Sequence, residues 1–185
     1  EVCEGQQYDM DYEHQANVSI ADYIEMIRLK TAVLLAASLK TGAIIAGAEA
    51  ADCNYIYQFG IHIGLAFQLK DDLLDVYGVQ EKFGKVSGGD IVAGKKTYLY
   101  LKVLETAGSE ADAFRRLYAA HDLESTEKIA RVKEVFNRLN IETQTRQLIN
   151  DYYQKALRDL SAISLPEEAM ESLTEYAAGL MEREN

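Results

Sequence analysis

The scarcity of proline restricts the fold more than any other feature, because the 185-residue chain contains only one, Pro166. Residues of high helix propensity, above all Ala, Leu, Glu, Lys and Ile, are abundant along the chain. No stretch alternates apolar and polar residues for long enough to suggest a β-sheet. The sequence therefore predicts an all-α fold, and its length suits a single domain.

Charge and composition exclude several classes of protein. The formal net charge of −11 makes the chain a poor nonspecific ligand for nucleic acid or an anionic membrane. A hydrophobic fraction of 48% excludes wholesale disorder, and no apolar run reaches the ~18 residues of a membrane span. Two cysteines, Cys3 and Cys53, are too few for a disulfide scaffold and suggest a reducing compartment. We therefore expect a cytoplasmic protein with no nucleic-acid partner and no stable membrane insertion.

Capping residues and glycines divide the chain into helical segments. Ser19 and Asp22 form a capping box that begins one helix, and Ser109 and Asp112 suggest a second box. The glycine-rich stretch 78–96 predicts a mobile loop. Helices are expected over roughly 1–12, 19–42, 50–76, 97–108, 109–120, 126–139, 141–162 and 166 to the end.

A strip of polar residues lies on the most apolar of these helices. Gln68, Asp71, Asp72 and Asp75 fall on one helical face within the segment 50–76. Burying carboxylates this close together is costly unless a positive charge compensates them. Mg²⁺, which takes oxygen ligands and often bridges carboxylates to a substrate phosphate, is the expected compensator. The alternative is a solvated acidic face.

Three lysines complete a coherent phosphate site. Lys30 lies mid-helix in an apolar stretch, and Lys85 lies in the glycine-rich loop. Lys95 shortly precedes the helix expected from residue 97, whose free backbone N–H groups favour anions. Each lysine taken singly would be read as a surface residue. Combined with the aspartate strip, they indicate a site for Mg²⁺ and a phosphorylated substrate.

Five ordered motifs resemble those of the trans-type polyprenyl diphosphate synthases. The segment from Phe67 to Asp75 resembles the second aspartate-rich motif of that family. The other segments resemble its G-Q-x-x-D, K-T, G-K-x-x-G-D-I and closing-lysine motifs, and in chain order they are Gly5–Asp9, Lys30–Thr31, Gly84–Ile91 and Gly94–Thr97. The resemblance runs from Glu1 through the final helix.

The resemblance implies a fold and an activity. Members of the family are helical isoprenoid-synthase bundles, normally homodimers, and they are prenyltransferases. They condense isopentenyl diphosphate with an allylic diphosphate in a Mg²⁺-dependent reaction that passes through an allylic cation. The physical chemistry agrees, because a departing diphosphate needs its growing charge neutralised.

The same resemblance implies a metal-binding set. Asp71 would ligate Mg²⁺ directly, and Asp72 and Asp75 would support it, Asp75 through water. Asp9 would lie near the metals, and Gln6 would line the same cavity.

It also implies residues that contact substrate. Lys30 and Lys95 would hold the allylic diphosphate, and Lys85 would join them when the loop closes. Thr31 and Gln68 would lie along the allylic chain and stabilise the developing cation.

The chain departs from the family pattern at its beginning. The first aspartate-rich motif and the basic residues for isopentenyl diphosphate should precede Glu1, so residues 1–185 are expected to be the C-terminal part of one synthase domain. An N-terminal truncation is the expected reason, with tag removal or a processed terminus as the alternative. The isolated chain is then expected to be inactive and to dimerise or aggregate.

Two other functions stay open at this point. One is a non-catalytic homologue that serves as the regulatory subunit of a heteromeric synthase. The other is a plain helical interaction domain whose acidic strip is solvated.

Overall fold

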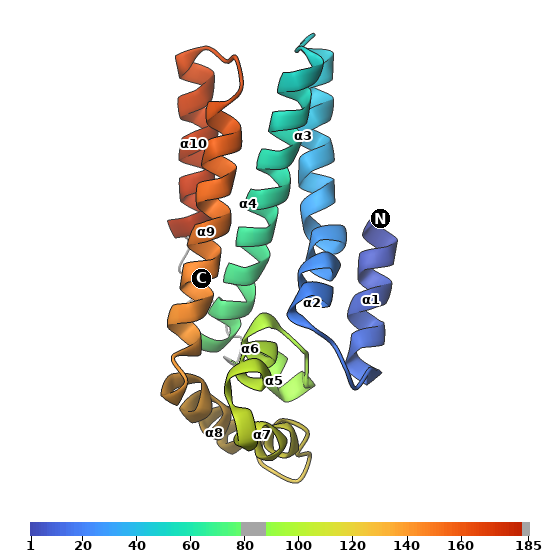
Figure 1. The fold of residues 1–185 in the computed structure, drawn as a ribbon, viewed down its shortest axis with the longest axis vertical. Coiled ribbons are helices and arrows are strands. Elements are labelled where there is room, and N and C mark those ends of the chain that lie inside the picture. The colour runs from blue at the N-terminus through green and yellow to red at the C-terminus, as the bar shows by residue number, and fades with distance from the viewer. Residues whose placement is uncertain (79–87, 183–185) are drawn as a thin grey trace.

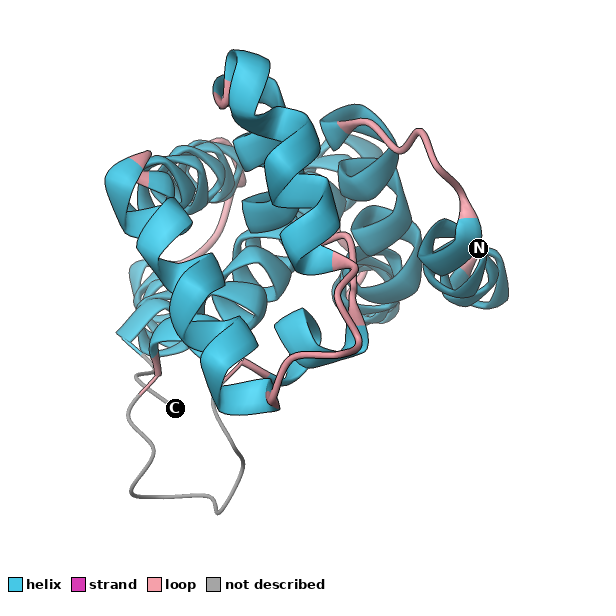
Figure 2. Ribbon diagram, turned by 90° about the horizontal axis from the view of Figure 1, so that it is seen from below, coloured by secondary structure: helices cyan, strands magenta, loops and turns pink. Residues whose placement is uncertain are grey.

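The computed structural model describes residues 1–78 and 88–182, and in these ranges every regular element is a helix (Figure 2). The predicted all-α class is thereby confirmed. Gly84 and Lys85, which the sequence assigned to a substrate-binding loop, lie outside the described residues.

The long helices form an elongated bundle, and shorter helices gather at one end of it (Figure 1). Packing against the central helix α4 comes mainly from α3 and α9. In chain order the elements are α1 (Val2–His14), α2 (Ile20–Ile27), a π-helix η1 (Arg28–Ala32), α3 (Val33–Ile45), α4 (Ala50–Tyr77), α5 (Gly89–Ala93), α6 (Tyr98–Thr106), a 3₁₀ helix η3 (Gly108–Glu110), α7 (Ala111–Tyr118), α8 (Ser125–Arg138), α9 (Ile141–Ser161) and α10 (Glu167–Glu182).

The first capping box is confirmed. The Asp22 backbone N–H donates to Ser19 Oγ at 3.1 Å, and the Ser19 N–H donates to Asp22 Oδ2 at 2.9 Å. The helix that follows is not uniform, however, because the π-helix η1 separates α2 from α3. Such wider turns occur often at functional sites.

Two sequence predictions about the other end of the molecule were wrong. Ser109 does not cap a helix, because it lies inside η3, whereas an N-cap needs non-helical backbone. Glu110 precedes α7 instead, without a side-chain capping bond. The stretch predicted to be a loop over 78–96 also contains a short helix, α5.

Close approach of α4 to both η1 and α3 places the polar strip in the bundle. A Cβ built on Gly60 would lie 2.5 Å from Ala36 Cα, and one built on Gly64 would lie 2.7 Å from Ala32 Cα. Only glycine therefore fits at these two positions of α4. Phe59 on the same helix is fully buried, so α4 lies in the core, as its apolar sequence predicted. Among the described residues, no helix is long and apolar enough to cross a membrane.

Candidate active site

The polar strip of α4 runs from the interior to the surface. Asp72 is buried at 8% exposure, Gln68 and Asp75 are partly buried, and Asp71 is exposed. Helical geometry explains the gradient, because neighbouring positions on a helix point about 100° apart. The four residues therefore share a broad face, as predicted, but their carboxylates meet different surroundings.

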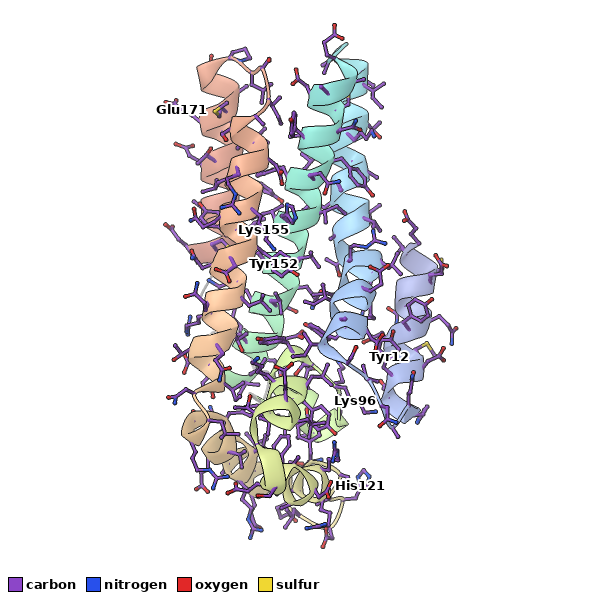
Figure 3. The ribbon with its side chains drawn as sticks, in the orientation of Figure 1. Tyr12, Lys96, His121, Tyr152, Lys155 and Glu171 are labelled. Atoms are coloured by element: carbon purple, nitrogen blue, oxygen red, sulfur yellow. The ribbon has the colours of Figure 1, made fainter. Side chains whose placement is uncertain are left out.

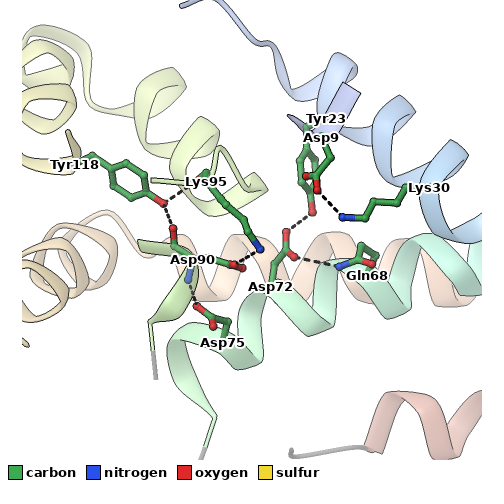
Figure 4. Close-up of polar contacts among 9 residues, drawn as sticks. All are labelled: Asp9, Tyr23, Lys30, Gln68, Asp72, Asp75, Asp90, Lys95 and Tyr118. Atoms are coloured by element: carbon green, nitrogen blue, oxygen red, sulfur yellow. Dashed lines mark hydrogen bonds and ion pairs between the residues drawn. The ribbon is translucent and has the colours of Figure 1, made fainter. Parts of the chain in front are cut away.

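Asp72 is held by two hydrogen-bond donors inside the bundle. The Tyr23 hydroxyl of α2 donates to Asp72 Oδ2 at 2.5 Å, and Gln68 Nε2 donates to Asp72 Oδ1 at 3.3 Å (Figure 4). Burial raises the pKa of Asp72 to about 7, although the hydrogen bond from Tyr23 opposes the shift. This carboxyl group is thus satisfied by protein donors on both oxygens.

Gln68 extends this hydrogen-bonded chain toward the π-helix. Thr31 Oγ1 donates to Gln68 Oε1 at 3.0 Å, so Thr31, Gln68, Asp72 and Tyr23 form one connected series. Three helical segments, η1, α4 and α2, contribute to it. Thr31 and Gln68, which the sequence analysis assigned to one site, are thus in direct contact.

Lys30 is the first cation of the site. Its Nζ lies 2.6 Å from Asp9 Oδ2 of α1, and both side chains are partly buried at 32% and 22% exposure. The approach of α1 to η1 depends on Gly5, since a Cβ there would lie 2.2 Å from the Lys30 backbone nitrogen. Gln6 is exposed on the same helix.

Lys95 is the second cation, and it stands on the other side of the strip (Figure 4). Its Nζ lies 2.6 Å from Asp90 Oδ1. Burial lowers the pKa of Lys95, but the hydrogen bond and negative charge of Asp90 outweigh burial and raise it overall. The Asp90 N–H donates to Asp75 Oδ2 at 3.0 Å, so this cation is joined to the strip through α5. Burial raises the pKa of Asp75.

The neighbouring Lys96 does something else. Its ammonium donates to the backbone carbonyls of Tyr12 and Glu13, at the end of α1 (Figure 3). Lys95 therefore faces the carboxylates, while Lys96 joins the segment after α5 to α1.

The described residues contain no group of three or more His, Cys, Asp or Glu side chains arranged to hold a metal ion. The donor chemistry nevertheless suits Mg²⁺, since Asp71 and Asp75 offer carboxylate oxygens on one face of α4. In the present arrangement lysines contact the nearby carboxylates Asp9 and Asp90.

Comparison with known proteins places this geometry in a family. The sequence profile of the polyprenyl synthetase family matches residues 1–139. The chain belongs to the polyprenyl synthetase family. The resemblance seen in the sequence motifs is thus confirmed.

Individual relatives agree with this polyprenyl synthetase assignment. A short chain isoprenyl diphosphate synthase of Methanothermobacter thermautotrophicus is 36% identical over 184 residues, which cover 100% of this chain and 56% of that protein. A crystal structure of a geranylgeranyl pyrophosphate synthase superposes with a TM-score of 0.92 at 42% identity, covering 100% of this chain and 57% of that one.

A geranylgeranyl pyrophosphate synthase of Corynebacterium glutamicum, solved with isoprenyl diphosphate and magnesium, has a TM-score of 0.88. It is 32% identical, and the match covers 98% of this chain and 52% of that one. The polyprenyl synthetase chain thus spans about half the length of the relatives it matches.

Sequence reasoning missed three residues of this polyprenyl synthetase site. Asp90 lies within a quoted motif but received no role, although Lys95 follows it by five positions. Tyr23 carries no local signal, because its partner Asp72 lies 49 positions away in sequence. Tyr118, whose hydroxyl donates to the Lys95 carbonyl at 2.7 Å, carries no local signal, because it ends an ordinary amphipathic helix.

Proposed function

We propose that the protein containing this chain is a Mg²⁺-dependent prenyltransferase that condenses isopentenyl diphosphate with an allylic diphosphate. The observation that carries the proposal is the position of Lys30 and Lys95 beside the aspartate strip of α4 (Figure 4). Membership of the polyprenyl synthetase family supports the reaction class. A homodimer in the cytoplasm, built on a single synthase domain, is part of the same proposal.

The reaction needs a site that stabilises a departing anion. The allylic carbon–oxygen bond breaks, diphosphate leaves, and the double bond of isopentenyl diphosphate attacks the allylic cation. Loss of a proton then restores a double bond and gives the elongated diphosphate. Cations fixed near the leaving group lower the barrier, because they neutralise charge that grows in the transition state.

Asp71 would hold Mg²⁺ with support from Asp75, and bound Mg²⁺ would supply Lewis-acid stabilisation of the leaving group. Asp72 would act as a support, since both of its oxygens already accept hydrogen bonds from Tyr23 and Gln68. Asp9 would remain near the metals through Lys30.

Lysines and neutral polar groups would divide the remaining work. Lys30 and Lys95 would bind the allylic diphosphate, and Lys85 would join them. Thr31 and Gln68 would lie along the allylic chain and stabilise the developing cation with their oxygen dipoles, and the Thr31 hydroxyl donates to Gln68 Oε1 at 3.0 Å. Gln6 would line the same cavity.

The first test measures binding by the 185-residue chain. Inorganic pyrophosphate with Mg²⁺ should raise its melting temperature, because a ligand of the native state stabilises it by about 2.7 kcal/mol at a hundred times its Kd. Asp71→Asn should abolish this rise. Glu171→Gln, an exposed carboxylate on α10 far along the bundle from the strip, should preserve it (Figure 3). A melting temperature that does not change with Mg²⁺ and pyrophosphate would instead favour a plain helical interaction domain.

The second test concerns turnover. In the protein produced from its complete coding sequence, Asp71→Asn should slow prenyl transfer by about a hundredfold or more. Unchanged turnover would defeat the proposal. The codons upstream of Glu1 should encode a first aspartate-rich motif, and an upstream sequence without it would point to a regulatory subunit.

A further inference from the structure

Helix α5 carries Asp90 and ends two positions before Lys95, but it is too short to be stable on its own. It has five residues, and Gly88 and Gly94 flank it with φ angles of 89° and 72°. A helix this short is unstable alone, since forming the first turn costs more entropy than its hydrogen bonds return. Contacts with the rest of the molecule must therefore determine where Lys95 stands.

Asp75 holds the beginning of this segment. Its backbone carbonyl accepts the Gly88 N–H at 2.6 Å, and its Oδ2 accepts the Asp90 N–H at 3.0 Å. Both bonds come from the end of α4, so they fix the beginning of α5 relative to the strip.

Tyr118 holds the end of the segment. Its hydroxyl donates to the Lys95 carbonyl at 2.7 Å and lies 3.5 Å from the Asp90 carbonyl (Figure 4). The Lys95 N–H also donates to the Asp90 carbonyl, at 3.0 Å. The phenol therefore lies beside the two carbonyls that enclose the Asp90–Lys95 turn.

The hydroxyl is itself held in a fixed place. Tyr118 is 4% exposed, and its ring packs against Tyr100 of α6 at a centroid distance of 4.5 Å and Phe114 at 5.6 Å. Lys128 of α8 lies over the ring at 5.6 Å. Aromatic packing within α7 and from α6, together with the Lys128 side chain of α8, thus sets the position of one polar atom, which then contacts the backbone of Lys95.

We propose that Tyr118 is a positioning residue, whose hydroxyl fixes the backbone of Lys95 so that the ammonium stands beside the aspartate strip. The side chain of Lys95 has four rotatable bonds and is 44% exposed, so its backbone sets the region that Nζ can reach. The role assigned to Lys95 rests on the proposed function, whereas the positioning of its backbone does not.

Amide hydrogen exchange tests the positioning directly on the 185-residue chain. Tyr118→Phe keeps the packed ring and removes only the donor. Exchange in residues 89–96 should become about fivefold faster, the equivalent of about 1 kcal/mol for one neutral hydrogen bond. Tyr100→Phe changes the same group on the adjoining ring and should leave this segment unchanged. Equal exchange in wild type and Tyr118→Phe, or an equal acceleration throughout α9, would overturn the proposal.

A double-mutant cycle tests the consequence for binding. Calorimetry should show that Tyr118→Phe weakens the binding of Mg²⁺-pyrophosphate about fivefold. In the Lys95→Gln variant, adding Tyr118→Phe should have no further effect. A purely structural role would weaken binding equally in both backgrounds and would contradict the proposal. Absence of any pyrophosphate binding in the wild type would contradict the proposed function instead, and hydrogen exchange would still decide the positioning.

Discussion

The two lysine–carboxylate pairs have the same chemistry, but very different backbone elements hold them in place. Lys30 and Asp9 meet at 2.6 Å, as do Lys95 and Asp90. The first pair joins two helical elements, α1 and η1, that touch backbone to backbone. The second pair lies around a five-residue helix between two glycines in the left-handed region.

This difference separates two ways of placing a charge. Close packing at Gly5 fixes the backbone of Lys30, so this backbone can move only if α1 and η1 separate. A hydrogen bond that Asp75 accepts from the Asp90 N–H and one that Tyr118 donates to the Lys95 carbonyl place Lys95, and each of these bonds contributes only about 1 kcal/mol. We expect the first pair to resist small changes and the second to respond to single polar groups.

The largest effect should come from Gly5→Ala. The new Cβ would lie 2.2 Å from the Lys30 nitrogen and 2.7 Å from the Leu29 carbonyl carbon, and backbone atoms cannot turn aside. Helix α1 should separate from η1, and its amides should exchange at least about a hundredfold faster, equivalent to about 3 kcal/mol.

The matched control is Gly42→Ala on α3, where a Cβ meets nothing within 4 Å. This variant should leave α1 protected and should gain up to about 1 kcal/mol, since alanine suits a helix better than glycine. If the amides of α1 stay protected from exchange in Gly5→Ala, the claim that close packing at Gly5 fixes the Lys30 backbone is wrong.

A smaller loss should follow from Tyr23→Phe. The substitution deletes the donor to Asp72 Oδ2 in a site where Tyr23 is 1% exposed, so the carboxyl group keeps only its bond from Gln68. We expect the free energy of unfolding in urea to fall by about 2 kcal/mol. The exposed Tyr176 of α10 supplies the control, and Tyr176→Phe should change stability by less than about 0.5 kcal/mol. Equal losses in both variants would contradict a special role for the buried hydroxyl.

The smallest effect concerns alkaline stability. Burial, followed by the negative charge of Asp90, holds the pKa of Tyr118 well above its ordinary value. Below about pH 10 both folded and unfolded chains keep this proton, and the stabilisation is complete. As the pH rises further, the unfolded chain loses its proton first, so the free energy of unfolding falls.

In Tyr118→Phe, the free energy of unfolding should therefore fall less steeply with rising pH, by a slope that corresponds to about one proton. The same substitution removes a hydrogen bond at neutral pH. Urea denaturation between pH 8.5 and pH 11 measures the slope. Tyr23 contributes its own alkaline loss, since burial raises its pKa as well, and that part should persist. If the free energy of unfolding of Tyr118→Phe varies with pH as steeply as that of the wild type, folding does not raise the pKa of Tyr118.

Local patterns predicted the half of the site that lies on continuous sequence. The spacing of Gln68, Asp71, Asp72 and Asp75 was enough to place them on one helical face, and the capping box at Ser19 was visible in four residues. Lys30 and Lys95 were also singled out from the sequence, and each forms an ion pair with a carboxylate, Asp9 and Asp90 respectively.

The other half depends on tertiary contacts that leave no local pattern. Tyr23 reaches Asp72 across 49 positions of sequence, and Tyr118 reaches Lys95 across 23. The second capping box failed for a related reason, because Ser109 satisfies the motif but lies in helical backbone. The metal ligands, the dimer and the role of Lys85 stay predictions.

The π-helix η1 sets the rotation about the helix axis between the packed face of α2 and the packed face of α3. Before η1, Tyr23 faces Asp72, whereas Ala32 at the end of η1 and Ala36 after it lie against the glycines of α4. Neighbouring positions of an α-helix differ by about 100°, so deleting one residue from 28–32 would rotate one surface relative to the other. Within η1, Lys30 contacts Asp9 of α1, whereas the next residue, Thr31, contacts Gln68 of α4. A single-codon deletion there would therefore be far more damaging than a substitution at any one of these positions.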